Sequence, residues 1–284
     1  MPELPEVEVL RRHLAPAIRN KVIRNVEVRR ARVLRPTAVR TFVHAVAGRK
    51  FTSLSRRGKY LLFSLQALAT KKPLLVLGHL GMSGRMYLLP KRALLPKHAA
   101  VILDLGKEQF IFEDTRYFGR LTLDMSPIAR LGPEPLENAR VPKEFADGLS
   151  RSRQSIKVKL LDQTLVAGIG NIYASEVLFR AKLSPKLPAR KLKPKQVVLL
   201  WDSIREVLTE AINCGSTVPL NFSGTGARDG LFYFGRSPDT PDFYEERLRV
   251  YDRAGQPCLK CGAEIKRLVQ ANRSTYFCPR CQRQ

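Results

Sequence analysis

The first residues of the chain, Met1, Pro2 and Glu3, are of types that could perform elimination chemistry at a sugar. Methionine before a small residue is normally trimmed, so we expect the mature chain to begin with the secondary amine of Pro2. Condensation of a secondary amine with an aldehyde gives an iminium ion, which makes the neighbouring carbon acidic. The carboxylic acid of Glu3 could protonate a leaving oxygen or open a sugar ring. The alternative is an ordinary Met-Pro start in which Pro5 and Glu6 only begin a helix.

Four of the five cysteines form two CxxC pairs with residues 262–277 between them. The four are Cys258, Cys261, Cys278 and Cys281. This spacing is typical of a closed tetrahedral zinc site, which leaves no open position for catalysis. A redox dithiol is the alternative, but no thioredoxin-like pattern surrounds either pair. We therefore predict one structural Zn²⁺ that holds a hairpin too small for a core of its own. We expect the fifth cysteine, Cys214, to be a buried thiol.

Residues 168–173, with the sequence GIGNIY, lead a glycine turn into a predicted helix. Exposed amides at a helix start suit a phosphate, and Asn171 can add a side-chain donor. The alternative is a tight turn whose glycines only allow close packing of the helix. The GxGN pattern alone does not decide between the two.

Three further candidates lie in a turn and two loops. Lys59 is in a basic turn before an apolar strand, where a lysine is usually a solvated charge. Met82 stands at the tip of a glycine-rich loop, and Phe118 lies in a second loop, residues 114–119. Side chains of these kinds can wedge between base pairs when a nucleotide is extruded. The alternative is that Met82 and Phe118 are core residues.

The composition indicates a polyanionic partner. Fifty Lys and Arg against 25 Asp and Glu give a formal charge of +25, spread along the whole chain. Nucleic acid is the first candidate, because neutralising phosphates releases counterions and supplies sequence-independent affinity. A basic protein without a particular partner is the alternative. The sequence holds no apolar run of membrane-spanning length and no signal-peptide core, so we expect a soluble, intracellular protein.

The elements that must position these residues change in type along the chain. An apolar repeat at helical spacing predicts a helix over residues 5–18, with Pro2 and Glu3 at its amino end. Short runs between Gly, Pro and Lys turns predict the strands of an antiparallel sandwich or barrel. These runs are 22–28, 51–54, 60–65, 74–80, 85–89, 99–105, 109–112 and 121–123.

The strand pattern ends near residues 131–135, which we predict to be a domain boundary. Helices are expected beyond it, at 142–149, 155–161, 172–180 and 194–213, followed by a loop at 215–235. The sequence therefore predicts a multidomain α+β chain, divided into residues 1–132, 133–240 and 241–284.

A series of motifs occurs in order across essentially the whole chain: MPELPEVE, RRGKYLL, HLGMSG, DTRYFG, LGPEPL, GIGNIYASE and the paired CxxC motifs. In this combination the sequence closely resembles the bacterial formamidopyrimidine-DNA glycosylases. The resemblance implies an N-terminal helix plus β-sandwich, a helix-two-turn-helix domain and a C-terminal zinc finger hairpin, with DNA in the cleft between the two halves.

The resemblance also implies an activity. It indicates a base-excision repair glycosylase that removes oxidised purines (8-oxoguanine, formamidopyrimidines) from double-stranded DNA and acts as a lyase at abasic sites. On matching positions, Pro2 attacks the anomeric sugar carbon, Glu3 is the general acid and Lys59 is the catalytic lysine near the lesion's phosphate or sugar. The resulting Schiff base supports β- and δ-elimination.

Further site residues follow from the same resemblance. Glu6 matches an acid that helps shape the lesion pocket. Met82, Arg116 and Phe118 match the side chains that fill the space left by the flipped base. The other expected substrate and DNA contacts are His98, Lys157, Asn171, Tyr173 and Arg273. The resemblance further implies a monomer without membrane association in the bacterial cytoplasm, at the nucleoid.

Two departures and two alternative functions accompany this interpretation. The family often has Arg or Lys where Tyr117 stands, and residues 214–230 diverge from the loop that closes over the flipped base in the family. An endonuclease VIII type enzyme, acting on oxidised pyrimidines, usually opens with PEGPE, so Leu4 argues against it. An inactive zinc-finger DNA binder is disfavoured because the residues at positions 2, 3 and 59 are intact.

Overall fold

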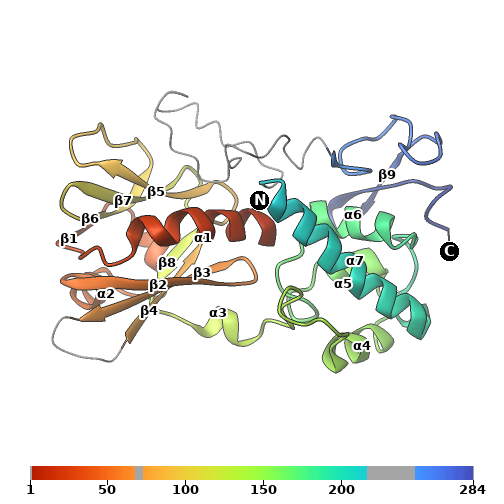
Figure 1. The fold of residues 1–284 in the computed structure, drawn as a ribbon, viewed down its shortest axis with the longest axis horizontal. Helices are drawn as coiled ribbons and strands as arrows, with labels where there is room; N and C mark the ends of the chain where they lie inside the picture. The colour runs from red at the N-terminus through yellow and green to blue at the C-terminus, as the bar shows by residue number, and fades with distance from the viewer. Residues whose placement is uncertain (1, 68–72, 216–246, 284) are drawn as a thin grey trace. The chain divides into compact units, whose positions relative to one another are not determined.

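The structure is a computed structural model that describes residues 2–67, 73–215 and 247–283. The described residues divide into two compact units (Figure 1). The N-terminal unit consists of Pro2 and residues 6–129, and the C-terminal unit of residues 3–5, 130–215 and 247–283. No helix in these ranges combines the length and the apolar character that a membrane span requires.

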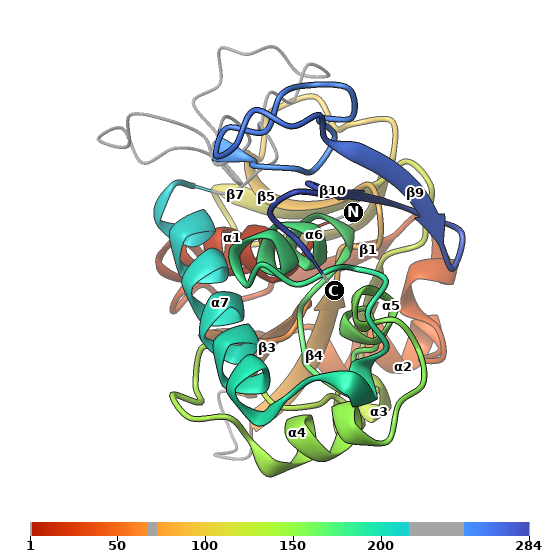
Figure 2. The ribbon, with the colours of Figure 1, turned by 90° about the vertical axis from the view of Figure 1, so that its right-hand side faces the viewer.

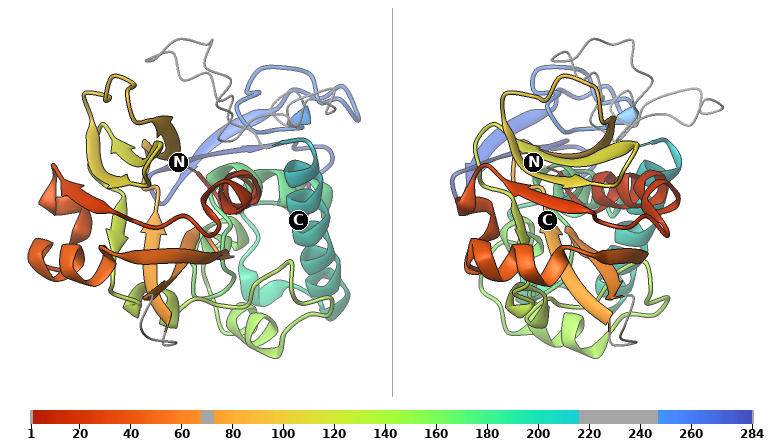
Figure 3. Two further views of the ribbon diagram at one scale, coloured as in Figure 1. Left: turned by 60° about the vertical axis from the view of Figure 1, so that its left-hand side comes forward. Right: turned by 90° about the vertical axis from the view of Figure 1, so that its left-hand side faces the viewer.

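The N-terminal unit contains two four-stranded antiparallel sheets. One sheet has the order β1 (Asn25–Val28), β6 (Ala99–Asp104), β7 (Glu108–Asp114) and β5 (Gly84–Pro90). The other has the order β2 (Arg49–Arg57), β3 (Tyr60–Ala67), β4 (Pro73–His79) and β8 (Arg120–Thr122). Figure 3 shows them as two layers, with β5 to β7 in yellow and β2 to β4 in orange. The predicted strands and the sandwich are confirmed.

The two sheets pack together through aromatic side chains. Phe110 of β7 lies 6.3 Å from Phe51 of β2 and 5.6 Å from Phe63 of β3, measured between ring centroids. Alternating burial along β3 explains how one face reaches this core while the other does not. Helix α1 (Leu4–Ile18) adds the apolar residues of its repeat to the same core, and it begins one residue before the predicted start.

Three short helical segments of the N-terminal unit were not predicted. They are η1 (Ala31–Leu34), α2 (Val39–Val46) and α3 (Ser126–Ala129). Helix α2 buries only Phe42 and Val46, and α3 buries none of its residues. Segments of four to eight residues hold too few turns for a helical repeat to be recognised in the sequence.

The C-terminal unit is helical up to its final hairpin. Its helices are α4 (Lys143–Ser150), α5 (Ile156–Leu160), α6 (Asn171–Arg180), η2 (Ala189–Lys191) and α7 (Pro194–Asn213). The predicted helices are confirmed, and only η2 was missed. Trp201 of α7 packs 4.8 Å from Phe145 of α4 and donates its indole N–H to the carbonyl of Asn138 at 3.0 Å. Cys214, directly after α7, is buried as expected.

The hairpin at the end of the chain pairs β9 (Lys266–Gln270) with β10 (Arg273–Phe277) and lies beside α6 (Figure 2). The buried carboxylate of Glu176 on α6 accepts backbone N–H bonds of 2.8–2.9 Å from Arg249, Val250 and Tyr251. Helix α6 therefore holds the segment that leads into the cysteines. The loop predicted at 215–235 lies, apart from Gly215, outside the described residues.

Candidate active site

The start of the chain is bound at the amino end of α6. The Glu3 carboxylate accepts backbone N–H bonds from Gly170 at 2.6 Å, Ile172 at 2.9 Å and Tyr173 at 3.4 Å. The Leu4 N–H donates to the carbonyl of Gly168 at 3.0 Å. A carboxylate at a helix start is favoured by the helix dipole and satisfies amides that lack partners within the helix.

For residues 168–173 this arrangement favours the tight turn over the phosphate cradle, the two alternatives that the sequence leaves open. Amides of this helix start already donate to Glu3, so an outside phosphate would have to displace that side chain. The glycines serve close packing instead. A Cβ on Gly170 would lie 2.3 Å from the Glu3 Cδ, and one on Gly168 would lie 2.5 Å from the side chain of Leu4.

Gly170→Ala is therefore expected to displace Glu3 and to slow any reaction that uses it. The backbone of Gly170 has φ −128°, which any residue adopts, so the effect comes from the added methyl group alone. Misplacing a catalytic group by about 1 Å costs on the order of a hundredfold in rate. Single-turnover kinetics on damaged DNA measure the loss. Gly148→Ala is the control, since its Cβ would meet only the flexible end of Leu165; equal activity of the two variants would contradict this role.

Lys157 and Asn171 lie together beside the same helix start. The Lys157 ammonium donates to the Asn171 side-chain oxygen and, at 3.4 Å, to the carbonyl of Ser274 on β10. Burial, opposed by the carboxylate of Glu3 and assisted by the cation of Arg273, lowers the pKa of Lys157 to about 8. The Lys157 side chain thus joins α5, α6 and the hairpin.

Lys157 and Tyr173, two of the expected DNA contacts, are both fully buried in this structure. Lys157 holds the half-buried Asn171 through its hydrogen bond to the Asn171 side chain. Arg273 is exposed at the start of β10, and β9 of the same hairpin carries two further exposed basic residues, Lys266 and Arg267.

Lys59 lies in the two-residue turn between β2 and β3, where Arg57 pairs with Tyr60. It is only 7% exposed, so the alternative of a solvated strand-edge charge is wrong. Next to it, burial together with the nearby cations of Lys59 and Arg120 lowers the pKa of His79 to about 4. His79 is therefore neutral at physiological pH. Glu6, the acid expected at the lesion pocket, is fully buried on α1.

Met82 lies in the loop before β5, and Arg116 and Phe118 lie in the loop after β7. Met82 is 47% and Phe118 43% exposed, so neither is a core residue. The Arg116 guanidinium lies 4.9 Å from the centroid of the Phe118 ring. Large apolar side chains are unfavourable when they are exposed to water. They can be buried by insertion into a base stack.

Asp114 joins these two loops and was not singled out in the sequence. Its carboxylate accepts from the Ser83 hydroxyl at 2.6 Å and from the backbone N–H groups of Arg116 and Gly119 at 3.0 and 2.7 Å. The loops approach so closely that a Cβ on Gly81 would lie 2.6 Å from the Gly119 nitrogen. An Asp at the start of a loop, bonding to its own backbone two residues on, was the available signal.

Tyr117, which departs from the family pattern, has φ +53°, a left-handed conformation that is costly for a bulky residue. Its hydroxyl accepts from the Arg30 Nε at 3.1 Å and lies 3.5 Å from the His98 Nδ1. The Arg30 guanidinium also covers the tyrosine ring at 5.4 Å. These contacts offset the strain and hold the loop in one conformation.

The four predicted zinc ligands form one cluster. Their sulfur atoms all lie within 4.8 Å of one another, with 3.4 Å between Cys261 and Cys278 and 4.0 Å between Cys258 and Cys281. Zinc–sulfur bonds of about 2.3 Å in a tetrahedron place the sulfurs about 3.8 Å apart, so the donor set fits one Zn²⁺. The predicted structural zinc site is confirmed, and all four positions of the metal are taken by the protein.

Comparison with known families gives three matches along the chain. The Formamidopyrimidine-DNA glycosylase N-terminal domain matches residues 1–121, and the Formamidopyrimidine-DNA glycosylase H2TH domain matches residues 131–221. The zinc finger found in FPG and IleRS matches residues 255–284.

Individual relatives are similar over their full length. The formamidopyrimidine-DNA glycosylase of Desulfitobacterium hafniense is 41% identical, over 99% of this chain and 100% of the relative. That of Thermus thermophilus is 39% identical, over 99% and 98%. Among solved structures, the Lactococcus lactis Fpg with abasic-site DNA has a TM-score of 0.85 at 33% identity, over 99% and 100% of the chains. MutM with carbocyclic 8-oxo-G DNA has a TM-score of 0.85 at 33% identity, over all of both chains.

Proposed function

Because the chain belongs to the formamidopyrimidine-DNA glycosylase family, we propose that it excises oxidised purines from double-stranded DNA and then cleaves the resulting abasic site. One observation carries the proposal beyond the family match. The first turn of the chain, with its amine and its carboxylic acid, is fixed at the start of α6 by backbone bonds to Glu3. A nucleophile without a side chain requires such a fixed terminus.

In the proposed reaction the Pro2 nitrogen bonds to the anomeric carbon of the damaged nucleotide, and the bond from that carbon to the base breaks. Three backbone N–H groups hold the Glu3 side chain at the start of α6. We propose that Glu3 receives the proton that it needs as a general acid from the Pro2 ammonium. This transfer leaves a neutral amine as the nucleophile and a carboxylic acid that can protonate the sugar ring oxygen. The Pro2 nitrogen loses its remaining proton to the departing base. Breakage of the bond between the anomeric carbon and the protonated ring oxygen then opens the sugar and leaves an iminium ion. The iminium ion acidifies the next carbon, and successive eliminations release the two phosphates.

The buried ammonium of Lys59 is assigned to the developing charge on the sugar or its phosphate. For the DNA backbone we propose Arg273, Asn171 and His98, which are exposed or half-buried. Glu6 is assigned to the wall of the lesion pocket. Lys157 and Tyr173 are assigned to positioning Asn171 rather than to direct contact.

We propose domain boundaries at residues 132/133 and 240/241. The family matches, which change at 121–131 and again at 221–255, support these positions. We further propose a monomer that acts in the bacterial cytoplasm at the nucleoid. The excess of 25 positive charges supports a protein that scans duplex DNA without regard to sequence.

Borohydride trapping tests the proposed function. The protein is incubated with duplexes that contain a single 8-oxoguanine, a single oxidised pyrimidine, a pre-formed abasic site or no damage. A covalent adduct on the 8-oxoguanine and abasic duplexes is expected. Trapping on the pyrimidine duplex in place of the 8-oxoguanine duplex would indicate an endonuclease VIII type specificity, and no adduct even at the abasic site would indicate an inactive DNA binder.

Met82→Ala and Phe118→Ala are expected to slow base excision but to spare cleavage at a pre-formed abasic site. Extruding a nucleotide costs a few kcal/mol of stacking and pairing, of which inserted side chains recover part. We expect about a tenfold loss in excision rate, corresponding to about 1.4 kcal/mol. Rates on both substrates are compared side by side. Leu94→Ala, at a residue 91% exposed elsewhere in the unit, is the control; equal loss on both substrates would assign these residues to the fold instead.

A further inference from the structure

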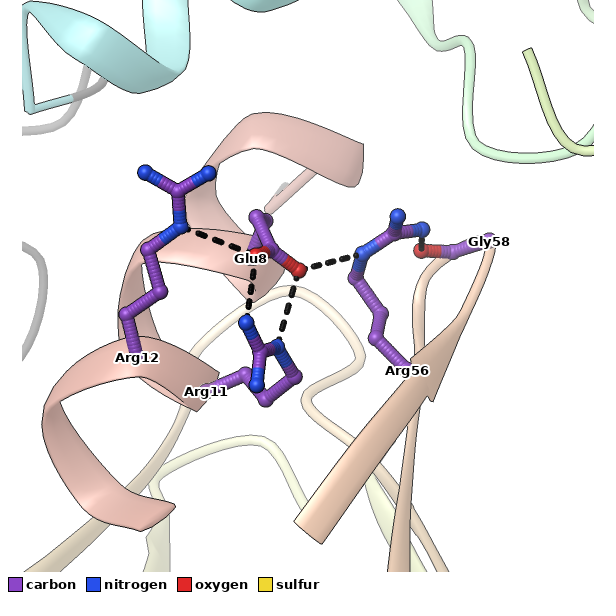
Figure 4. Close-up of polar contacts among 5 residues, drawn as sticks. All are labelled: Glu8, Arg11, Arg12, Arg56 and Gly58. Atoms are coloured by element: carbon purple, nitrogen blue, oxygen red, sulfur yellow. Dashed lines mark hydrogen bonds and ion pairs between the residues drawn. The ribbon is translucent and has the colours of Figure 1, made fainter. Parts of the chain in front are cut away.

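A buried carboxylate on α1 binds three arginines at once (Figure 4). Glu8 Oε1 accepts from Arg11 Nη2 at 2.8 Å and from Arg12 Nε at 2.9 Å. Its other oxygen accepts from Arg11 Nε and Arg56 Nε, both at 3.0 Å. Arg11 and Arg12 lie on α1 itself, whereas Arg56 comes from β2. The carboxylate therefore joins two elements that are far apart in the sequence.

The Glu8 carboxylate remains ionised at neutral pH. Burial alone would raise the pKa of Glu8, but the hydrogen bonds from Arg11, Arg12 and Arg56 outweigh it and lower the pKa to about 2. Four charge-assisted hydrogen bonds use both oxygens of the carboxylate. Such a group acts as a fixed anchor and not as a proton donor.

Arg56 connects the Glu8 carboxylate to the turn that contains Lys59. While its Nε bonds to Glu8, its Nη1 donates to the carbonyl of Gly58 at 3.0 Å, as Figure 4 shows. Its side chain is 6% exposed, so water does not compete for these bonds. Gly58 has φ +55°, and the next residue is Lys59. The guanidinium thus fixes the backbone one peptide away from that lysine.

Glu8 stands on the helix whose amino end bears Pro2, less than two turns of helix away. We propose that Glu8 and Arg56 are positioning residues that set Lys59 relative to the nucleophile-bearing end of α1. This inference rests on the proposed function, because it assumes that Pro2 and Lys59 act on the same nucleotide. Its physical basis is a fork-shaped donor that bridges a carboxylate and a carbonyl, which a lysine cannot reproduce.

Arg12 supplies a matched comparison within the same cluster. It bonds to the same carboxylate at 2.9 Å, but its side chain is 53% exposed, and within the described part of the chain its hydrogen bond leads to Glu8 alone. Exposed pairs of this kind contribute little to stability. Loss of Arg12 removes one cation from Glu8 without touching the Gly58 carbonyl, whereas Arg56→Lys keeps a cation near Glu8 and removes the bridge.

The test measures single-turnover excision, duplex affinity and thermal unfolding for the full chain and for Arg56→Lys, Arg12→Gln and Glu8→Gln. Arg56→Lys is expected to lower the single-turnover rate constant about tenfold through misplacement of Lys59, with affinity and melting temperature unchanged. Arg12→Gln is expected to leave that rate unchanged. Glu8→Gln, which releases Arg56 while keeping its shape, is expected to lower the rate at least as much as Arg56→Lys does.

Each outcome bears on the proposal. Wild-type rate in Arg56→Lys, or equal losses in Arg56→Lys and Arg12→Gln, would overturn it. If Arg56→Lys has a lowered melting temperature, Glu8→Gln is compared with Arg12→Gln instead. Equal single-turnover rate constants in those two variants would also overturn the proposal. Absence of excision and trapping in the unaltered protein would instead refute the proposed function, so the two failures are distinguishable.

Discussion

Replacing Pro2 with glycine is expected to reduce both base excision and borohydride trapping by about a hundredfold or more. Methionine before glycine is also trimmed, so the variant keeps a terminal amine. That amine is primary, and its condensation product carries a positive charge only when it is protonated. The secondary amine of proline gives a permanently charged iminium ion and therefore a stronger electron sink for elimination.

Mass spectrometry of the trapped adduct locates the reactive nitrogen. Digestion of the wild-type adduct should place the sugar on the peptide that begins with Pro2. Undamaged duplex should bind the variant as well as it binds the wild type, because the change leaves the basic surface and the zinc cluster intact. An adduct on Lys59, together with full activity of Pro2→Gly, would assign the nucleophile to the lysine.

Loss of one zinc ligand is expected to have an effect of similar size on DNA binding. Cys278→Ser removes a thiolate from the closed set of four, and zinc binding supplies on the order of 10 kcal/mol to the folding of small zinc modules. The hairpin β9–β10 buries few apolar residues of its own, with both Lys266 and Arg267 exposed. Without the metal it should unfold and withdraw Arg273 from the DNA backbone.

Zinc content, duplex affinity and the melting curve check this expectation on the same preparations. Cys214→Ser is the matched control, because this thiol is buried beside α7 and is not part of the cluster. The control should keep its zinc and its affinity for DNA. Normal binding and cleavage by metal-free Cys278→Ser would show that the module has another role.

The sequence predicts well what neighbouring residues determine. The bounds of α7 follow from Pro194 at its first turn and from its apolar repeat. The zinc cluster follows from the spacing of its cysteines within two short loops. Strands β2 to β8 follow from short apolar runs between turn residues, which alternate in β3 and are continuously buried through most of β6.

Local sequence patterns do not predict contacts between distant parts of the chain. Glu3 and Gly170 are 167 positions apart, and nothing in the local sequence of either indicates that one binds the other. The same limit explains why the glycines before α6 suggested a phosphate, and why Lys59 suggested a solvated charge. Burial of a polar residue depends on what the rest of the fold places beside it.

The attachment of the first turn to α6 has a consequence for the order of synthesis. Residues Glu3–Pro5 belong to the C-terminal unit, although they leave the ribosome first. Domains generally begin to fold from the N-terminus during translation. Here the sandwich can form early, yet the amine of Pro2 acquires its fixed place only after residues 168–173 have emerged. A truncated nascent chain thus carries a reactive terminus that is not poised for reaction, and competence arises only when most of the polypeptide has been made.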